Sequence, residues 1–170
     1  MKKIVLALSV IIFVTGISSA QTIGIGIGNK APELTGKAPS GESFKLSDTK
    51  GKLVLLDFWA AWCPPCRREN PAIVAAYNKF KNKKFTNGNG FTVFGVSLDR
   101  TEADWKKAIE NDKLSWPYHI SDLQYWNSKH AAIYGVRSIP TNFLLDENGV
   151  IIGRNLKGPA LEAELQKYLK

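Results

Sequence analysis

The order of apolar and amphipathic segments predicts an α/β fold in which helices flank a central mixed β-sheet. Two near-continuous apolar runs, Lys52–Ala60 and Phe91–Asp99, are typical of central strands that are covered on both faces. An amphipathic segment lies between them, which is the strand–helix–strand order of parallel sheets. Residues 141–156 predict two further strands around an Asp-Glu-Asn-Gly turn, so an antiparallel pair is expected to complete the sheet.

The first 20 residues have the pattern of a secretory signal peptide. A basic start, MKK, precedes the apolar run Ile4–Ile17, and small residues lead to Ala20. The run is shorter than the ~20 residues that span a bilayer, so we expect cleavage, and membrane contact only if the segment is retained. The expected location is therefore periplasmic or otherwise extracytoplasmic. The glycine-rich residues 21–28 are expected to be flexible, and residues 29–170 to form one domain.

Four local patterns predict the elements around the two central strands. Residues 31–48 contain short apolar pieces separated by Gly, Pro and Ser, which indicate a small β-hairpin before the main domain. Residues 67–84 carry apolar side chains at helical spacing, and Pro71 is expected to kink this helix. Residues 101–112 predict a helix that begins at Thr101. Residues 158–170 predict a closing helix with a leucine stripe.

The segment between the second central strand and the late strand pair predicts a helical insertion. Residues 116–120 are expected to be a short extended piece. Residues 121–135 predict a further helix, with Ser121 and Gln124 as its capping box and Gly135 as its end.

The charge of the chain favours a basic soluble surface over a nucleic-acid interface. The formal net charge is +8, but the lysines are scattered through the predicted helices and loops and form no single run. An exported protein would in addition rarely meet nucleic acid, so no nucleic-acid partner is expected.

Both cysteines of the chain lie in the stretch WCPPC, as Cys63 and Cys66. A disulfide between them would close almost no loop, and its entropic gain of roughly 2 kcal/mol makes a purely structural role unattractive. A structural zinc site needs four ligands, and His119 and His130 lack the short spacing of a zinc finger, which argues against structural zinc. Two thiolates alone can hold Cu(I), so a copper-binding, metallochaperone-like module stays open as an alternative.

A redox role explains the position of the pair better than these alternatives. Cys63 is expected at the N-cap of the helix that follows the first central strand, with Pro64 and Pro65 in its first turn. The helix N-terminus favours the Cys63 thiolate, which is the attacking form in disulfide exchange. Pro65 withholds one N–H donor, so the Cys66 N–H is the main donor left. A moderately lowered pKa of Cys63, and a reductant rather than a strong oxidant, are therefore expected.

Two acidic residues lie close to the pair in sequence. Asp57 interrupts an apolar strand, where burial should raise its pKa and allow it to act as the base for the Cys66 thiol. Glu69 follows Cys66 by one helical turn and is a second candidate for proton transfer, although it can equally serve only to complement the helix dipole. Arg67 and Arg68 are expected on a solvated helix face.

At this point the sequence resembles a known family. DFWAAWCPPC at 57–66, followed by GVRSIPTNFLLD at 135–146, resembles the thioredoxin superfamily, and more narrowly its exported TlpA/ResA-like thiol–disulfide oxidoreductases. The resemblance covers roughly residues 29–170. It implies a thioredoxin fold with an N-terminal β-hairpin and a central helical insertion at about residues 101–134.

The resemblance also implies a mechanism. Cys63 would be the nucleophile and Cys66 the resolving thiol, and Asp57 and Glu69 would occupy the acidic positions of the family. Pro140 matches the family's cis-proline. Five residues are expected to bind the substrate, either because the resemblance implies it or because they adjoin the cysteines in sequence: Trp62, Pro64, Pro65, Ile139 and Pro140.

The implied function is that of an exported reductase of protein disulfides that needs no cofactor beyond the Cys63–Cys66 pair. Its partners would be protein disulfide substrates and a membrane dithiol donor that re-reduces the pair. Cytochrome c maturation and envelope thiol homeostasis are family expectations, and disulfide isomerase or oxidase roles stay open. Peroxiredoxins share the fold, but they need Thr three residues before the reactive cysteine, where this chain has Ala60.

Overall fold

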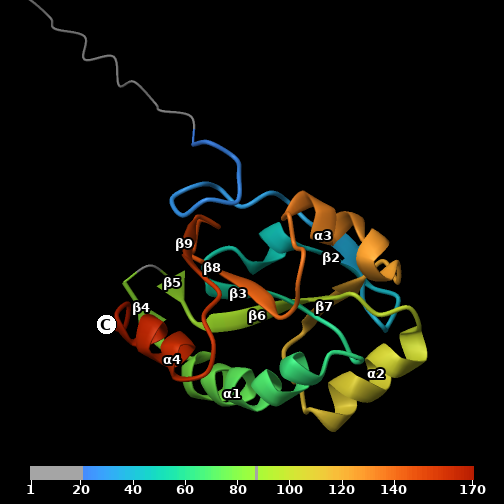
Figure 1. Ribbon diagram of the computed structural model, residues 1–170. Helices are drawn as coiled ribbons and strands as arrows, with labels where there is room; N and C mark the ends of the chain where they lie inside the picture. Colours follow the sequence, from blue (N-terminus) through green and yellow to red (C-terminus); the bar gives the residue numbers. More distant parts are fainter. Residues whose placement is uncertain (1–20, 87) are drawn as a thin grey trace, which may run out of the picture.

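A seven-stranded mixed sheet forms the centre of the molecule in the computed structural model, which describes residues 21–86 and 88–170 (Figure 1). The strand order is β2-β1-β7-β6-β3-β8-β9. The strands are β1 Thr35–Lys37, β2 Ser43–Lys45, β3 Leu53–Trp59, β6 Phe91–Ser97, β7 Tyr118–Ser121, β8 Thr141–Leu145 and β9 Ile151–Arg154. A separate two-stranded ribbon pairs β4 Lys84–Phe85 with β5 Gly88–Asn89. The α/β class and the mixed sheet predicted from the sequence are confirmed.

The two apolar runs of the sequence form the central strands. Every residue of β3 and β6 is buried, and the two strands pair in parallel, as does β6 with β7. The other neighbour of β3 is β8, which runs antiparallel to it and continues through an antiparallel pair into β9. Since β3 lies near the middle of the sheet, groups placed at its carboxyl end are shielded from water on several sides.

Helices cover both faces of the sheet. In Figure 1, α1 Pro64–Phe80 and α4 Pro159–Gln166 lie together on one side of the sheet, and α3 Lys129–Ile133 lies on the other. The apolar face of α1 buries Ile73 and Phe80, and α4 buries Leu161 and Leu165. Helix α2 Glu102–Asn111 begins after Thr101, whose hydroxyl accepts from the Asp104 N–H, as predicted.

The predicted N-terminal hairpin is formed by β1 and β2, and it extends the main sheet by pairing with β7. A short 3₁₀ turn, η1 Leu46–Thr49, leads from the hairpin to β3. The inserted segment therefore contains a sheet strand as well as helices. Residues 116–120 were expected only as an extended piece, and β7 shows that this piece is hydrogen-bonded into the sheet.

The prediction of one helix over residues 121–135 is wrong. Ser121 ends β7, and its hydroxyl donates to the Ser97 carbonyl at 2.9 Å. Leu123 and Tyr125 have φ values of 56° and 55°, which no right-handed helix accommodates. The segment instead forms a 3₁₀ turn, η2 Tyr125–Asn127, and the short α3, whose N-cap is Ser128. Gly135, with a φ of 59°, does follow the end of α3 as predicted.

The predicted signal peptide lies outside the described residues. Residues 21–28 were expected to be flexible, but they form a turn beside β9. The Gly28 N–H donates to the Ile151 carbonyl at 2.8 Å, and the Lys30 N–H donates to the Thr22 carbonyl at 2.9 Å. Within residues 21–86 and 88–170, no helix has the length and apolar character needed to span a membrane.

Candidate active site around the cysteine pair

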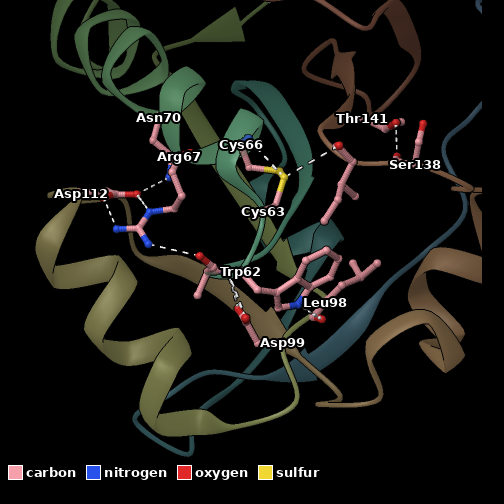
Figure 2. The surroundings of a disulfide bond; sticks show 12 residues. Trp62, Cys63, Cys66, Arg67, Asn70, Leu98, Asp99, Asp112, Ser138 and Thr141 are labelled. Carbon is pink, nitrogen blue, oxygen red and sulfur yellow. Dashed lines mark hydrogen bonds and ion pairs between the residues drawn. A yellow bond between two sulfur atoms is a disulfide. The ribbon is translucent and has the colours of Figure 1, made fainter.

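Cys63 and Cys66 are joined in a disulfide at the start of α1 (Figure 2). Cys63 is the N-cap residue of the helix, and Pro64 and Pro65 occupy its first turn, as the sequence predicted. The Cys66 N–H donates to the Cys63 sulfur at 3.2 Å. Neither proline has an N–H to give, so this is the only helix-end donor that the structure provides to the Cys63 sulfur among the described residues.

The loop before β8 approaches the same sulfur from the other side. The Ile139–Pro140 peptide bond is cis, which agrees with the family resemblance. The Ile139 carbonyl oxygen lies 3.8 Å from the Cys63 sulfur. Main-chain groups of this loop are therefore within reach of a polypeptide whose disulfide meets Cys63, and the substrate-binding roles of Ile139 and Pro140 stay predictions with this geometry behind them.

Asp57 lies on β3 with 2% of its surface exposed. Its direct cross-strand neighbours are Gly95 on β6 and Asn142 on β8, neither of which carries charge. Among the described residues, Asp57 Oδ1 has no hydrogen-bond partner. Burial is the main reason why the pKa of Asp57 rises to about 7; the negative charge of Glu69 raises it further, and the positive charge of Lys157 lowers it. The predicted rise is confirmed, and a carboxylate of this kind is suited to exchange a proton near neutral pH.

Glu69 lies on α1, partly buried, where one oxygen accepts a hydrogen bond from the Gly158 N–H at the start of α4. Its carboxylate thus has a definite structural task, which the sequence did not suggest. Its charge still acts on Asp57, so its proposed part in proton transfer remains a prediction.

A hydrogen-bonded brace that includes Asp99, Arg67 and Asp112 (Figure 2) fixes Ala61 in the loop that leads to Cys63. Both carboxylate oxygens of Asp99 accept from the Ala61 N–H, at 3.0 and 3.1 Å. The Ala61 carbonyl accepts from Arg67, whose guanidinium also forms a two-pronged ion pair with Asp112 at the end of α2. Asn70 donates to the same Asp112 at 2.6 Å. Arg67 is therefore not merely part of a solvated face, whereas Arg68 is exposed as expected.

No local sequence signal identifies this brace. In the sequence, Asp99 lies 38 residues after Ala61, and Asp112 lies 45 residues after Arg67. Asp99 ends a predicted strand, and Asp112 ends a predicted helix, but neither position singles out a partner.

Trp62 presents an exposed aromatic surface beside the disulfide. Its side chain is 39% exposed, while its indole N–H donates to the Leu98 carbonyl at 3.0 Å. Tyr125 and Trp126 of the insertion pack against it, with ring centroids 4.7 and 5.9 Å away. Pro64 and Pro65 are exposed on the same turn. These residues are accessible to a partner, and their substrate-binding roles stay predictions.

The two histidines do not converge on the cysteines. His119 is buried, contacts the Leu114 carbonyl at 3.1 Å and stacks on Trp116. Its burial lowers its pKa to about 4. His130 is buried on α3 and contacts the Thr35 carbonyl at 3.0 Å. Over residues 21–86 and 88–170, no group of three or more His, Cys, Asp or Glu side chains is arranged to hold a metal ion.

Comparison with known proteins places this geometry in a family. The sequence pattern of the AhpC/TSA family matches residues 27–154. The thiol–disulfide oxidoreductase ResA of Bacillus thuringiensis is 33% identical over 144 residues, which cover 85% of this chain and 77% of the relative. The thioredoxin-like protein YneN of Bacillus subtilis is 38% identical over 133 residues, which cover 78% of this chain and 73% of YneN.

Solved structures give the same result for the fold. The thioredoxin domain of a thiol–disulfide oxidoreductase from Bacteroides vulgatus superimposes with a TM-score of 0.76 at 39% identity, covering 86% of this chain and 100% of that domain. A thiol:disulfide interchange protein from a Bacteroides species superimposes with a TM-score of 0.71 at 37% identity, covering 89% of this chain and 90% of that one. The thioredoxin fold expected from the sequence is confirmed.

Proposed function

The chain belongs to the AhpC/TSA family and is a thiol–disulfide oxidoreductase, and we propose that it works as a reductase of protein disulfides outside the cytoplasm. The observation that carries the proposal is the disulfide between Cys63 and Cys66 at the N-terminus of α1, which follows the strand that bears the buried Asp57. A nucleophile at a helix end and a proton acceptor near neutral pH are the two groups that disulfide exchange requires.

The reduced pair acts in two exchange steps. The Cys63 thiolate attacks one sulfur of the substrate disulfide; that S–S bond breaks, one substrate thiolate leaves and takes up a proton, and a mixed disulfide forms. The Cys66 thiol then gives its proton to the Asp57 carboxylate, and the resulting thiolate attacks the Cys63 sulfur. The Cys63–Cys66 disulfide forms as the second substrate thiol leaves with a proton. Two electrons have passed from the pair to the substrate, so a dithiol donor must reduce the pair again.

The direction of exchange follows from the donors around Cys63. A thiolate that is strongly stabilised makes the reduced form stable and the disulfide oxidising. Here Pro65 removes one helix-end donor and leaves the Cys66 N–H, at 3.2 Å. With one such donor, the reduced pair is less stabilised than it would be with two, and this favours transfer of electrons from the pair to substrates.

The Ile139 loop and the Trp62 surface are the proposed contacts for a polypeptide substrate. The carbonyl of Ile139 lies 3.8 Å from the Cys63 sulfur, and the exposed Trp62 flanks it. An extended substrate segment can pair with the main chain of the loop while its disulfide meets Cys63. Pro64 and Pro65 complete the exposed rim of this surface.

The cellular setting is proposed from the N-terminal residues. The signal-peptide pattern of residues 1–20 supports export, and disulfide chemistry of this kind persists outside the cytoplasm. A membrane dithiol donor would supply the electrons. The cysteines of an apocytochrome c are one substrate class that the family resemblance implies, together with other oxidised envelope proteins.

The test is reduction of insulin disulfides by the dithiol-activated protein. We expect the Cys63→Ser variant to lose activity and the Cys66→Ser variant to retain the first attack and accumulate the mixed disulfide. Wild-type activity in Cys63→Ser would contradict the mechanism. A redox titration then tests the direction: a potential near that of a strong oxidant, about −120 mV, would contradict a reductase role.

A further inference from the structure

The end of the sheet opposite the cysteine pair brings together lysines from separate segments. Lys52 precedes β3 and Lys81 follows α1, whereas Cys63 lies between the end of β3 and the start of α1. The seven-residue strand and the 17-residue helix each span about 25 Å. In Figure 1, β4, β5 and the end of α1 lie together on the left, away from the start of α1. The lysines therefore lie about 25 Å from the disulfide.

Four of these lysines line one hollow of about 390 Å³ between the turn after α1 and the start of β3: Lys52, Lys81, Lys83 and Lys84. Lys52 is half-buried and the other three are exposed. Within the part of the chain that the structure describes, no carboxylate lies at ion-pair distance from any of the four. Their like charges repel one another, so an approaching anion would be attracted to the hollow.

A second hollow adjoins the first across the segment Lys50–Lys52. It is lined by Lys50 itself, by Lys30 and by Ile23. Between the two hollows, the Gly51 N–H donates to the turn that joins β8 and β9 at 2.9 Å, and the Gly51 carbonyl accepts from β5 at 2.8 Å. The two hollows therefore form one continuous surface.

The charge of this surface is positive. Six lysines line the two hollows, against two carboxylates, those of Glu33 and Asp146. Both carboxylates are already engaged, because each accepts two main-chain N–H groups. Beside them, one oxygen of Glu147 accepts from the Asn148 amide. The lysines are thus the charged groups that remain available to a partner.

Exposed isoleucines accompany the lysines. Ile23 and Ile27 are 70% and 68% exposed on the turn of residues 21–28. This turn is bound to the start of β9, where the Gly28 N–H donates to the Ile151 carbonyl. Because β8 runs antiparallel to β3 and β9 runs antiparallel to β8, the start of β9 lies at the same end of the sheet as the start of β3. We call the two hollows and this turn the basal surface.

The preceding part of the chain leads to the basal surface. Residues 1–20, which include the apolar run Ile4–Ile17, join the described structure at Gln21. The Gln21 amide donates to the Gly28 carbonyl at 3.4 Å, so the chain enters at the exposed turn itself. A bilayer that held the apolar run would therefore face the basal surface.

We propose that the basal surface docks on the anionic headgroups of a lipid bilayer. The lysines face the headgroups, and Ile23 and Ile27 enter the boundary between headgroups and acyl chains, as basic surfaces with exposed apolar side chains do. The contact does not require that residues 1–20 are retained, so it goes beyond the proposed function and beyond the membrane contact expected from the sequence. It holds Cys63 about 25 Å from the headgroups and facing away from the bilayer, where oxidised envelope proteins can reach it.

Vesicle binding of residues 21–170 tests the proposal. A solved thioredoxin domain matches 86% of this chain over its whole length, so residues 21–170 are expected to fold without the preceding segment, which circular dichroism checks. The protein should bind vesicles with about 30% phosphatidylglycerol some 100-fold more tightly than vesicles of phosphatidylcholine alone. About 0.5 M NaCl should remove most of this difference. Equal binding to both kinds of vesicle, or no binding, would overturn the proposal.

Two triple variants with the same change in net charge separate the basal surface from overall charge. Lys81→Gln, Lys83→Gln and Lys84→Gln together should weaken binding to the anionic vesicles about 100-fold. The matched control replaces three exposed lysines on or beside α2 and α3, and it should weaken binding by less than about threefold: Lys107→Gln, Lys113→Gln and Lys129→Gln. An equal loss in both triple variants would contradict a docking surface at the basal end.

The isoleucines distinguish a bilayer from an acidic protein. Ile23→Ser with Ile27→Ser should weaken vesicle binding about tenfold and leave binding to soluble polyglutamate unchanged. If the isoleucines made no difference to vesicle binding while the basal lysines did, an acidic protein would fit the surface better and the bilayer would be the wrong partner. Insulin reduction judges the proposed function separately: a protein that binds vesicles and reduces no disulfide would overturn that function alone.

Discussion

Two buried aspartates stand at the same end of neighbouring parallel strands, and their surroundings differ. Asp57 lies on β3 and Asp99 lies two residues after β6, with 2% and 1% of their surfaces exposed. Asp99 accepts from the Ala61 N–H with both oxygens and from the Ser97 hydroxyl at 2.7 Å. Asp57 Oδ1, by contrast, has no partner among the described residues.

The difference shows how one sheet end supports both structure and chemistry. Burial raises the pKa of both carboxyl groups, but hydrogen bonds from Ser97 and Ala61 oppose the rise at Asp99. A carboxylate whose oxygens are satisfied holds its partners in place and gains little from binding a proton. A buried carboxylate with an unsatisfied oxygen is destabilised when charged, and it accepts a proton readily. Asp99 thus fixes the loop before Cys63, while Asp57 is the carboxylate that the proposed mechanism uses as a base.

Replacing Asp57 by Asn should give the largest effect on stability. The folded-state pKa is about 7 and the ordinary value is 3.8, so the folded protein holds a proton that the unfolded chain has lost between these pH values. The unfolding free energy of wild type should therefore fall by about 4 kcal/mol as pH rises through this window. Asp57→Asn should lose this dependence and be the more stable protein at pH 8, as measured by urea unfolding at pH 4 and pH 8.

The same variant should be impaired in catalysis. Without a base for the Cys66 thiol, the resolving step should slow by about 100-fold at pH 7, and the mixed disulfide should accumulate. The variant and wild type could instead differ in unfolding free energy by the same amount at pH 8 as at pH 4. That result would show that the pKa of Asp57 is not raised in the folded protein, and it would remove the contrast with Asp99.

Replacing Asp99 by Ala should change stability in the opposite direction. The substitution leaves the Ala61 N–H and the buried Ser97 hydroxyl without their acceptor, at a cost of about 2 kcal/mol. Urea unfolding at pH 7 measures this loss, and Asp99→Asn, which keeps one acceptor oxygen, should lose less. If Asp99→Ala were instead stabilised at pH 8, the two aspartates would be equivalent.

Replacing Asp112 by Ala should give the smallest of these effects. This carboxylate pairs with Arg67 at a site that is partly exposed, so its loss should cost about 1 kcal/mol. The exposed pair of Lys106 and Glu102 on α2 is a matched control, and Glu102→Ala should cost only a few tenths of a kcal/mol. A loss in Asp112→Ala no greater than in Glu102→Ala would show that the second half of the Ala61 brace contributes nothing measurable.

Local patterns were sufficient for much of the fold. The apolar runs gave β3 and β6, and the hairpin, the late strand pair and helices α1, α2 and α4 were also predicted. The helix expected over residues 121–135 failed because a capping pattern at Ser121 does not reveal that Ser121 pairs with β6. Leu and Tyr are also not residue types that favour positive φ, so the φ values of Leu123 and Tyr125 could not be predicted from the sequence.

The sequence by itself determined which main-chain donors the helix end offers to Cys63, because these donors belong to neighbours within one helical turn. Cys63 at the N-cap, two prolines without N–H groups and the single donor of Cys66 are all local. Only the tertiary structure decided that the oxygens of Asp99 receive hydrogen bonds, whereas Asp57 Oδ1 has no partner among the described residues, since the groups that bind carboxylates here come from distant parts of the chain. The bonds to Asp99, Asp112 and Glu69 join residues 38, 45 and 89 positions apart, and such contacts form only when the sheet and its helices have packed.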